Sequence, residues 1–286
     1  MFTDGPVTPT RLETLINLMR EFSRREITRE ILFDLLQPET LPNVDPKKRD
    51  GAEQTLAAAR DLGLLIEDSD KRLKLTFDSN DKRGSRQIIL NALDEKVLAN
   101  EIVEPYFARF YSYLLGLNSE GIKNRTRVEW VSRFERDAFA GNFPTNPFNA
   151  DKVSGLNRWF SFTGLGWYDT SSVFQPNPYE RLLRRLPLIF GKEKKVTGEI
   201  FMQRLTQYCP ELDGGEIFRM ANRSYNSEVK ICTLGLSHAL VDLHQEKKIR
   251  LVCPRDSRGW SIELAEPPSG DGLDSSRIDS IEFLKN

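Results

Sequence analysis

The clearest indication of the fold is the segment Leu62-Gly63-Leu64-Leu65-Ile66-Glu67-Asp68. Before it, a helix begins near Asp50 and carries apolar side chains at helical spacing, and Gly63 suits the left-handed terminus of that helix. Residues 64–68 then predict a strand, and the alternating residues 72–77 predict its hairpin partner. The sequence therefore predicts a helix that stops on glycine and leads directly into a hairpin.

Two more helices are expected before this one. Thr8 can cap a helix that has Pro9 in its first turn, and a stripe of apolar residues follows at helical spacing. A second helix is expected from about Thr28, followed by a proline-containing loop. Three helices and then a hairpin is the order of a winged helix, so residues 1–86 predict an N-terminal winged helix that ends in a polar stretch.

The same order recurs near the other end of the chain, in residues 191–265. Helices are expected from Thr197, from Asp213 and from about Ile231, and two apolar strands follow them. The strands Ile249–Val252 and Trp260–Leu264 are predicted to form a hairpin around residues 255–259. This segment therefore predicts a C-terminal winged helix.

Residues 87–190 predict a helical, aromatic-rich middle domain. Its helix near residues 149–163 leads into Gly164-Leu165-Gly166-Trp167-Tyr168, which repeats the helix, glycine, strand order of the first segment. We interpret it as a degenerate winged helix whose hairpin is not evident. Residues 266–286 predict a flexible acidic tail with a short apolar end. The expected fold class is thus mainly α with small β-hairpins, built of tandem winged-helix modules, two clear and one degenerate.

The sequence gives no indication of catalysis, metal or a cofactor. None of the common nucleotide-binding, zinc-protease or serine-hydrolase motifs is present. Cys209, Cys232 and Cys253 are widely spaced and are interpreted as small core residues, and only His238 and His244 could add imidazole ligands. With no signal-peptide or membrane-span pattern and no small-molecule site evident, we expect a non-enzymatic cytoplasmic protein.

The modest net charge of −1 means that any contact with DNA must come from local patches of cations. In a winged helix the third helix can enter the major groove and the hairpin can reach the backbone. Polar and basic side chains of the first and third modules occupy these places. The candidate DNA-binding residues are Lys47, Lys48, Arg49, Gln54, Thr55, Arg60, Lys71, Arg72, Lys74, Lys247, Lys248, Arg250, Arg255 and Arg258.

The alternative is that these cations form a solvated surface, matched by neighbouring carboxylates such as Asp50, Glu53 and Asp70. Further polar residues stand on the corresponding helices of the other two modules and are weaker candidates. They are Lys152, Ser154, Asn157 and Arg158 in the second module, and Thr233, Ser237 and His238 in the third.

Three stretches carry a resemblance to a known family. They are Gly5-Pro6-Val7-Thr8-Pro9-Thr10-Arg11, the Leu62–Leu65 join, and residues 156–167, which read Leu-Asn-Arg-Trp-Phe-Ser-Phe-Thr-Gly-Leu-Gly-Trp. In these and in general layout the chain resembles the DpdG family, accessory proteins of bacterial gene islands that insert deazaguanine bases into DNA and restrict foreign DNA. The resemblance implies a bacterial protein of a modification or defence system, with other island proteins as partners. It transfers no functional residues.

Two functional hypotheses follow. The first is a DNA-binding accessory or regulatory protein that contacts duplex DNA through third helices and basic hairpins. The second is a protein-interaction adaptor that assembles a multiprotein complex with little direct DNA contact. A steep salt dependence of DNA binding would distinguish the first from the second.

Overall fold

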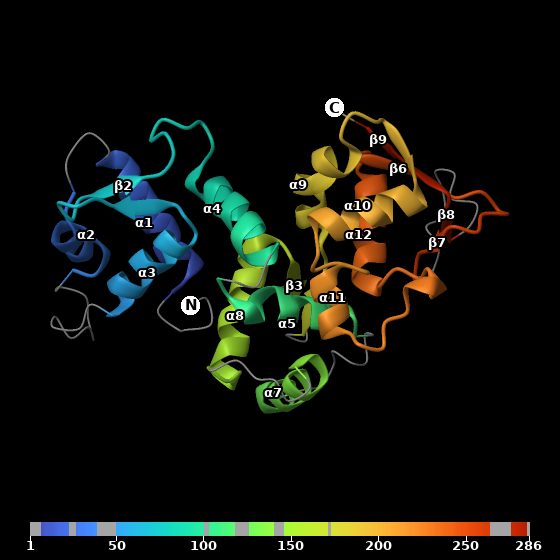
Figure 1. The fold of residues 1–286 in the computed structure, drawn as a ribbon, viewed down its shortest axis with the longest axis horizontal. Helices are drawn as coiled ribbons and strands as arrows, with labels where there is room; N and C mark the ends of the chain where they lie inside the picture. Colours follow the sequence, from blue (N-terminus) through green and yellow to red (C-terminus); the bar gives the residue numbers. More distant parts are fainter. Residues whose placement is uncertain are drawn as a thin grey trace.

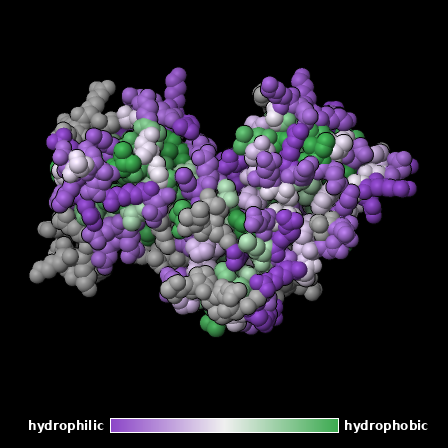
Figure 2. Space-filling view, in the orientation of Figure 1, coloured by the Kyte–Doolittle hydropathy of each residue, from purple (hydrophilic) through white to green (hydrophobic). Residues whose placement is uncertain are grey.

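The computed structural model describes residues 7–22, 27–38, 50–99, 103–117, 126–139, 146–170, 173–263 and 276–284. The protein is mainly α-helical, with small antiparallel strand pairs, as the sequence predicts. Helices α4, α5, α7 and α8 lie between an N-terminal part and a C-terminal part (Figure 1). The surface seen in Figure 2 is mostly hydrophilic and is interrupted by small apolar patches over both parts.

The N-terminal part has the order that its sequence predicts. It comprises α1 (Pro9–Glu21), α2 (Arg29–Leu36), α3 (Asp50–Asp61), β1 (Leu65–Glu67) and β2 (Leu73–Leu75). Thr8 caps α1, because its hydroxyl oxygen accepts a hydrogen bond from the Arg11 amide at 3.2 Å. Gly63 follows α3 with a φ of 69°, and β1 then pairs antiparallel with β2. The helix, glycine and hairpin order of this part is therefore confirmed.

The middle part is held together by aromatic side chains. It comprises α4 (Ser85–Leu93), η1 (Asp94–Leu98), α5 (Pro105–Leu115), α7 (Arg127–Phe134), η2 (Glu135–Phe139) and α8 (Ala150–Thr163), where η1 and η2 are π-helical. Phe110 and Phe134 pack edge to face with ring centroids 4.9 Å apart. Trp159 of α8 is fully buried, and its indole donates a hydrogen bond to the Val7 carbonyl at 3.2 Å. The middle helices therefore pack directly against the N-terminal part.

A second hairpin follows α8 at the place where the sequence showed none clearly. Helix α8 ends at Gly164, which has a φ of 70°. Strand β3 (Gly166–Tyr168) then pairs antiparallel with β4 (Phe174–Pro176). The middle part thus has the same helix, glycine and hairpin succession as the N-terminal part.

The C-terminal part differs from its prediction in strand pairing. It comprises α9 (Tyr179–Phe190), β5 (Lys195–Thr197), α10 (Gly198–Tyr208), α11 (Glu216–Ala221), η3 (Ser227–Val229), α12 (Leu234–Gln245), β6 (Ile249–Val252), β7 (Trp260–Ser261), β8 (Arg277–Ile278) and β9 (Ser280–Phe283). The predicted hairpin between residues 249–252 and 260–264 is wrong. Strand β6 pairs with β9, and β7 pairs with β8.

The prediction of a flexible tail at residues 266–286 is wrong for residues 276–284. Strand β9 is the middle strand of the sheet β5-β9-β6 and pairs antiparallel with both neighbours. Ile278 and Ile281 are buried. Acidic composition suggested a tail, but the burial of these isoleucines and two rows of strand hydrogen bonds hold the segment in the sheet.

Candidate functional site

The exposed face of helix α3 is acidic. Thr55, predicted to contact DNA, is 1% exposed, and its hydroxyl donates a hydrogen bond to the Gly51 carbonyl at 2.6 Å. The prediction is wrong because Thr55 faces the core. The exposed face of α3 instead carries Asp50, Glu53 and Asp61, whose carboxylates would meet phosphates with like charge.

Gln54 and Arg60, the other candidates on α3, are only partly exposed. Arg60 forms an ion pair with Glu67 of β1, so its guanidinium joins the helix to the hairpin. Because of this ion pair, the Arg60 guanidinium is less available to a DNA phosphate. Lys47, Lys48 and Arg49 lie outside the described residues.

Among the N-terminal candidates that the structure describes, the most accessible cations lie on the β1–β2 hairpin. Lys71 lies in the turn with a φ of 61° and is exposed, and Lys74 has a side chain 60% exposed beside Asp68, with the charged atoms 2.8 Å apart. Arg72 is half-buried, and an isolated bridge pairs it with Thr28. The hairpin thus presents three cations within four residues.

Asp68 gives this hairpin its shape. Its carboxylate accepts hydrogen bonds from the amides of Asp70 at 3.0 Å and Arg72 at 2.9 Å, which fixes the turn. The hydrogen bond from Lys74 and those from the backbone hold the pKa of Asp68 below its usual value. Asp68 is therefore ionised at neutral pH and offsets part of the hairpin's positive charge.

The basic candidates of the C-terminal part do not share one hairpin. Lys247 follows α12 with a φ of 57° and is exposed, and Lys248 is half-buried. Arg250 of β6 lies 3.5 Å from Glu282 of β9. Arg255 and Arg258 are exposed in the segment between β6 and β7. Because these two strands pair with different partners, the five residues form no single hairpin surface.

Several weaker candidates are buried. Lys152 of α8 is 2% exposed, and its ammonium donates a hydrogen bond to the Asn146 side chain at 2.6 Å. Ser237 of α12 is fully buried. These two predictions are wrong, because both side chains complete internal hydrogen bonds. His238 is exposed, on the part of α12 that faces the β3–β4 hairpin.

A buried ionic cluster joins the middle and C-terminal parts. Arg181 of α9 is completely buried and contacts Glu211 at 2.7 Å and Asp94 at 3.3 Å. Arg184 also contacts Asp94, at 2.8 Å. Burial raises the pKa of the Glu211 carboxyl, while Arg181 opposes that shift. No sequence pattern indicates this cluster, because the residues that form its hydrogen bonds, Arg181 with Glu211 and Arg184 with Asp94, are 30 and 90 residues apart.

A second buried carboxylate anchors α12. Asp213 is fully buried and accepts hydrogen bonds from the Thr233 amide at 2.6 Å and from the Thr233 hydroxyl at 2.8 Å. Thr233 is the N-terminal cap of α12. Burial raises the pKa of Asp213 to about 6, although the hydrogen bonds from Thr233 act in the opposite direction. The sequence suggested that Asp213 caps the short helix after it, but that cap is absent from α11, which begins after Gly215.

Asp213→Asn is expected to remove one component of the pH dependence of stability. With a pKa raised from 3.8 to about 6, folded Asp213 binds more protons than unfolded Asp213 across this window. The contribution of Asp213 to the free energy of unfolding therefore falls as the pH rises. Denaturant unfolding should show the wild type, relative to Asp213→Asn, about 1 kcal/mol more stable at pH 5 than at pH 7.

Ser224→Ala, at an exposed position, is the control because it changes no titratable group. It should reproduce the pH dependence of the wild type. If the free energies of unfolding of the wild type and Asp213→Asn differed equally at pH 5 and pH 7, the raised pKa of Asp213 would be contradicted.

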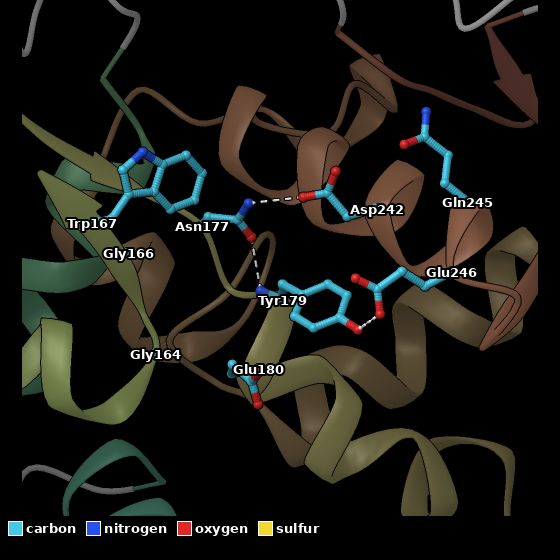
Figure 3. Close-up of a pocket in the computed structure, with 9 residues that line it drawn as sticks. All are labelled: Gly164, Gly166, Trp167, Asn177, Tyr179, Glu180, Asp242, Gln245 and Glu246. Atoms are coloured by element: carbon cyan, nitrogen blue, oxygen red, sulfur yellow. Dashed lines mark hydrogen bonds between the residues drawn. The ribbon is translucent and has the colours of Figure 1, made fainter. Parts of the chain in front are cut away.

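An open pocket of about 320 Å³ lies between α12, the start of α9 and the β3–β4 hairpin (Figure 3). Its lining includes the carboxylates of Glu180, Asp242 and Glu246 and the rings of Trp167 and Tyr179. Gly164, Gly166, Asn177 and Gln245 also line it, and none of the described residues that line it is a lysine or arginine.

Hydrogen bonds fix the wall of this pocket. Buried Asn177 donates from its amide to Asp242 at 3.1 Å and accepts from the Tyr179 amide at 2.8 Å. The Tyr179 hydroxyl donates to Glu246, and burial together with this bond raises the pKa of Tyr179. No sequence pattern indicates this pocket, since its lining comes from segments about 65 residues apart that only the fold brings together.

Among the described residues, no group of three or more histidine, cysteine, aspartate or glutamate side chains is arranged to hold a metal ion. In the same part of the chain, every helix is too short or too polar to cross a membrane.

Comparison with known proteins identifies the family. Residues 3–257 match the DpdG-like family, and the chain belongs to it. This confirms the predicted resemblance and associates the chain with a deazaguanine modification system. No significant match was found among curated proteins or among solved structures.

Proposed function

We propose that this protein is a non-enzymatic accessory protein of its modification system that binds the phosphate backbone of duplex DNA through the β1–β2 hairpin. The observation that carries the proposal is the group of Lys71, Arg72 and Lys74 on a hairpin that directly follows the third helix. Cations on such a hairpin suit phosphate contacts. A role in a bacterial defence or restriction system and a cytoplasmic location are part of the same proposal.

The acidic face of α3 argues against recognition of a base sequence by this protein. With Asp50, Glu53 and Asp61 exposed on that helix, insertion into a groove would bring carboxylates close to phosphates. We therefore propose contact with the backbone alone, without recognition of a base sequence. Binding of this kind is weak and depends on salt.

Fluorescence anisotropy with two duplexes of unrelated sequence, across a salt series, tests the proposal. Contact with the backbone alone predicts similar affinity for both duplexes. Three phosphate contacts predict that the logarithm of the association constant falls with the logarithm of the salt concentration with a slope of about −2.7. Lys71→Glu/Arg72→Glu should reduce the affinity by at least about tenfold. Each reversed charge replaces attraction to a phosphate with repulsion.

Lys247→Glu/Lys248→Glu is the matched control, since it reverses two charges at another positive-φ turn. It should leave the affinity within about twofold of the wild type. Loss of binding in this variant, but not in the hairpin variant, would place the contact elsewhere. Absence of binding at low salt would reject DNA contact altogether.

A second candidate function is an adaptor that binds other proteins of the system. Ile31 and Leu35 of α2 and Ile66 of β1 are 47%, 41% and 54% exposed. Apolar side chains that remain exposed in this way are common at protein–protein contacts. The adaptor hypothesis is the one to pursue if duplex DNA does not bind.

A further inference from the structure

Trp167 of β3 lies between an acidic pocket and an apolar pocket. It is 50% exposed and lines both the acidic pocket of Figure 3 and a smaller pocket of about 100 Å³. The smaller pocket is lined mainly by apolar residues. They are Leu114, Leu115, Leu117, Pro176, Leu234 and Gly235, together with Gln175 and His238.

The acidic pocket is chemically suited to a basic side chain. Glu180, Asp242 and Glu246 give it three carboxylates, with no lysine or arginine among its lining residues in the described part of the chain. The rings of Trp167 and Tyr179 add faces on which a guanidinium or ammonium group can rest. A partner's arginine or lysine would therefore meet both opposite charge and aromatic surface.

The apolar pocket is suited to a small aliphatic side chain. Leucine side chains from α5 and α12 and the ring of Pro176 form its walls. This cavity of about 100 Å³ has a mainly apolar lining, which suits a branched aliphatic group. The two pockets therefore select two different side chains on either side of Trp167.

Both pockets share one face of α12. His238, Asp242 and Gln245 are spaced by four and three residues, so they lie on the same side of the helix. From Gly235 to Gln245 the helix rises about 15 Å. An extended chain covers that length with about five residues. Together, the two pockets thus span the length of an extended segment of about five residues.

Close packing holds this groove in shape. Gly164 has a φ of 70°, and a Cβ there would lie 2.7 Å from the Glu180 side chain. A Cβ on Gly235 would lie 2.8 Å from the Pro176 carbonyl oxygen. The β3–β4 hairpin is therefore seated tightly between α9 and α12, and a bound segment meets a preformed surface.

We infer that this groove binds an extended segment of a partner protein, with a lysine or arginine in the acidic pocket and an aliphatic residue in the apolar pocket, on either side of Trp167. This interaction is separate from the proposed DNA contact, which uses the β1–β2 hairpin. Charge complementarity favours the basic residue, and the apolar lining of the smaller pocket favours the aliphatic one.

The test is selection from a displayed library of random hexapeptides on the full-length chain. Enriched peptides should contain a lysine or arginine and an aliphatic residue within four positions of it. A labelled enriched peptide should then lose at least about tenfold in affinity on Trp167→Ala, because an exposed tryptophan at the centre of a contact commonly dominates its affinity. Glu180→Lys, at an exposed position outside the hydrogen bonds of the pocket wall, should weaken it similarly.

Tyr168→Ala and Glu228→Lys are the matched controls. Tyr168 is the neighbouring exposed aromatic residue on β3, but it is not part of either pocket lining, and Glu228 is exposed in η3. Both should retain the wild-type peptide affinity. Trp167→Ala should also retain wild-type DNA binding, which separates failure of this inference from failure of the proposed function.

Three results would overturn the inference. They are a selection that enriches no peptide, enriched peptides without a basic residue, and peptide binding that survives both Trp167→Ala and Glu180→Lys. Because Glu180→Lys changes an exposed side chain, its outcome remains informative even if Trp167→Ala fails to fold.

Discussion

Arg181→Met is expected to lower the free energy of unfolding by about 3–5 kcal/mol. Arg181 is completely buried between Glu211 and Asp94, at 2.7 Å and 3.3 Å. Its removal leaves Glu211 fully buried without a compensating charge, while Asp94 keeps Arg184. Denaturant unfolding monitored by circular dichroism gives the measurement.

Arg223→Met is the matched control, since Arg223 is exposed. It should change the free energy of unfolding by less than about 0.5 kcal/mol. The double variant Arg181→Met/Glu211→Met should recover part of the lost stability, because it removes the uncompensated carboxylate as well. An effect of Arg181→Met no larger than that of the control would contradict the role of this cluster.

Deletion of residues 276–286 is expected to prevent the C-terminal part from folding. The deletion removes β9 from the centre of the sheet and leaves β5 and β6 with unpaired edges. It also removes Ile278 and Ile281 from the core. Amide hydrogen exchange should show protection lost across β5, β6 and α12.

Ile281→Ala and Glu282→Ala provide a graded test on adjacent residues of β9. Ile281 is 1% exposed, and its truncation should cost about 2–5 kcal/mol in the free energy of unfolding. Glu282 pairs with Lys195 and Arg250 at the surface, and its truncation should cost less than about 1 kcal/mol. Normal stability of the deletion variant would mean that the segment behaves as the tail that its composition suggests.

Local features of the chain were predicted well from the sequence. Thr8, Thr28 and Thr197 cap the helices that begin beside them. Gly63 ends the third helix, and the hairpin follows immediately. These features depend on neighbours within a few residues, so the sequence contains nearly all the information they require.

Two of the errors concern polar side chains that were assigned to the surface and lie in the core. Thr55 was expected to face solvent as a polar residue on a helix, but it faces the core and satisfies its hydroxyl within α3. Lys152 was expected on a reading surface, but it is buried and hydrogen-bonded to Asn146. Their polarity did not keep Thr55 and Lys152 at the surface, because a local hydrogen bond offsets the cost of burying each side chain.

Local sequence was enough to predict most of the helices, several of their caps and the two places where a helix passes through glycine into a strand. The partners of those elements depend on the tertiary structure. Strand β6 pairs with β9 across about 30 residues, Arg181 meets Asp94 across about 90, and Asp242 meets Asn177 across 65. Helix periodicity and capping depend on residues a few positions apart, so they can be recognised in the sequence. Strand pairing, buried ion pairs and pockets depend on which distant segments pack against each other and exclude water from their contact, and no local pattern contains that information.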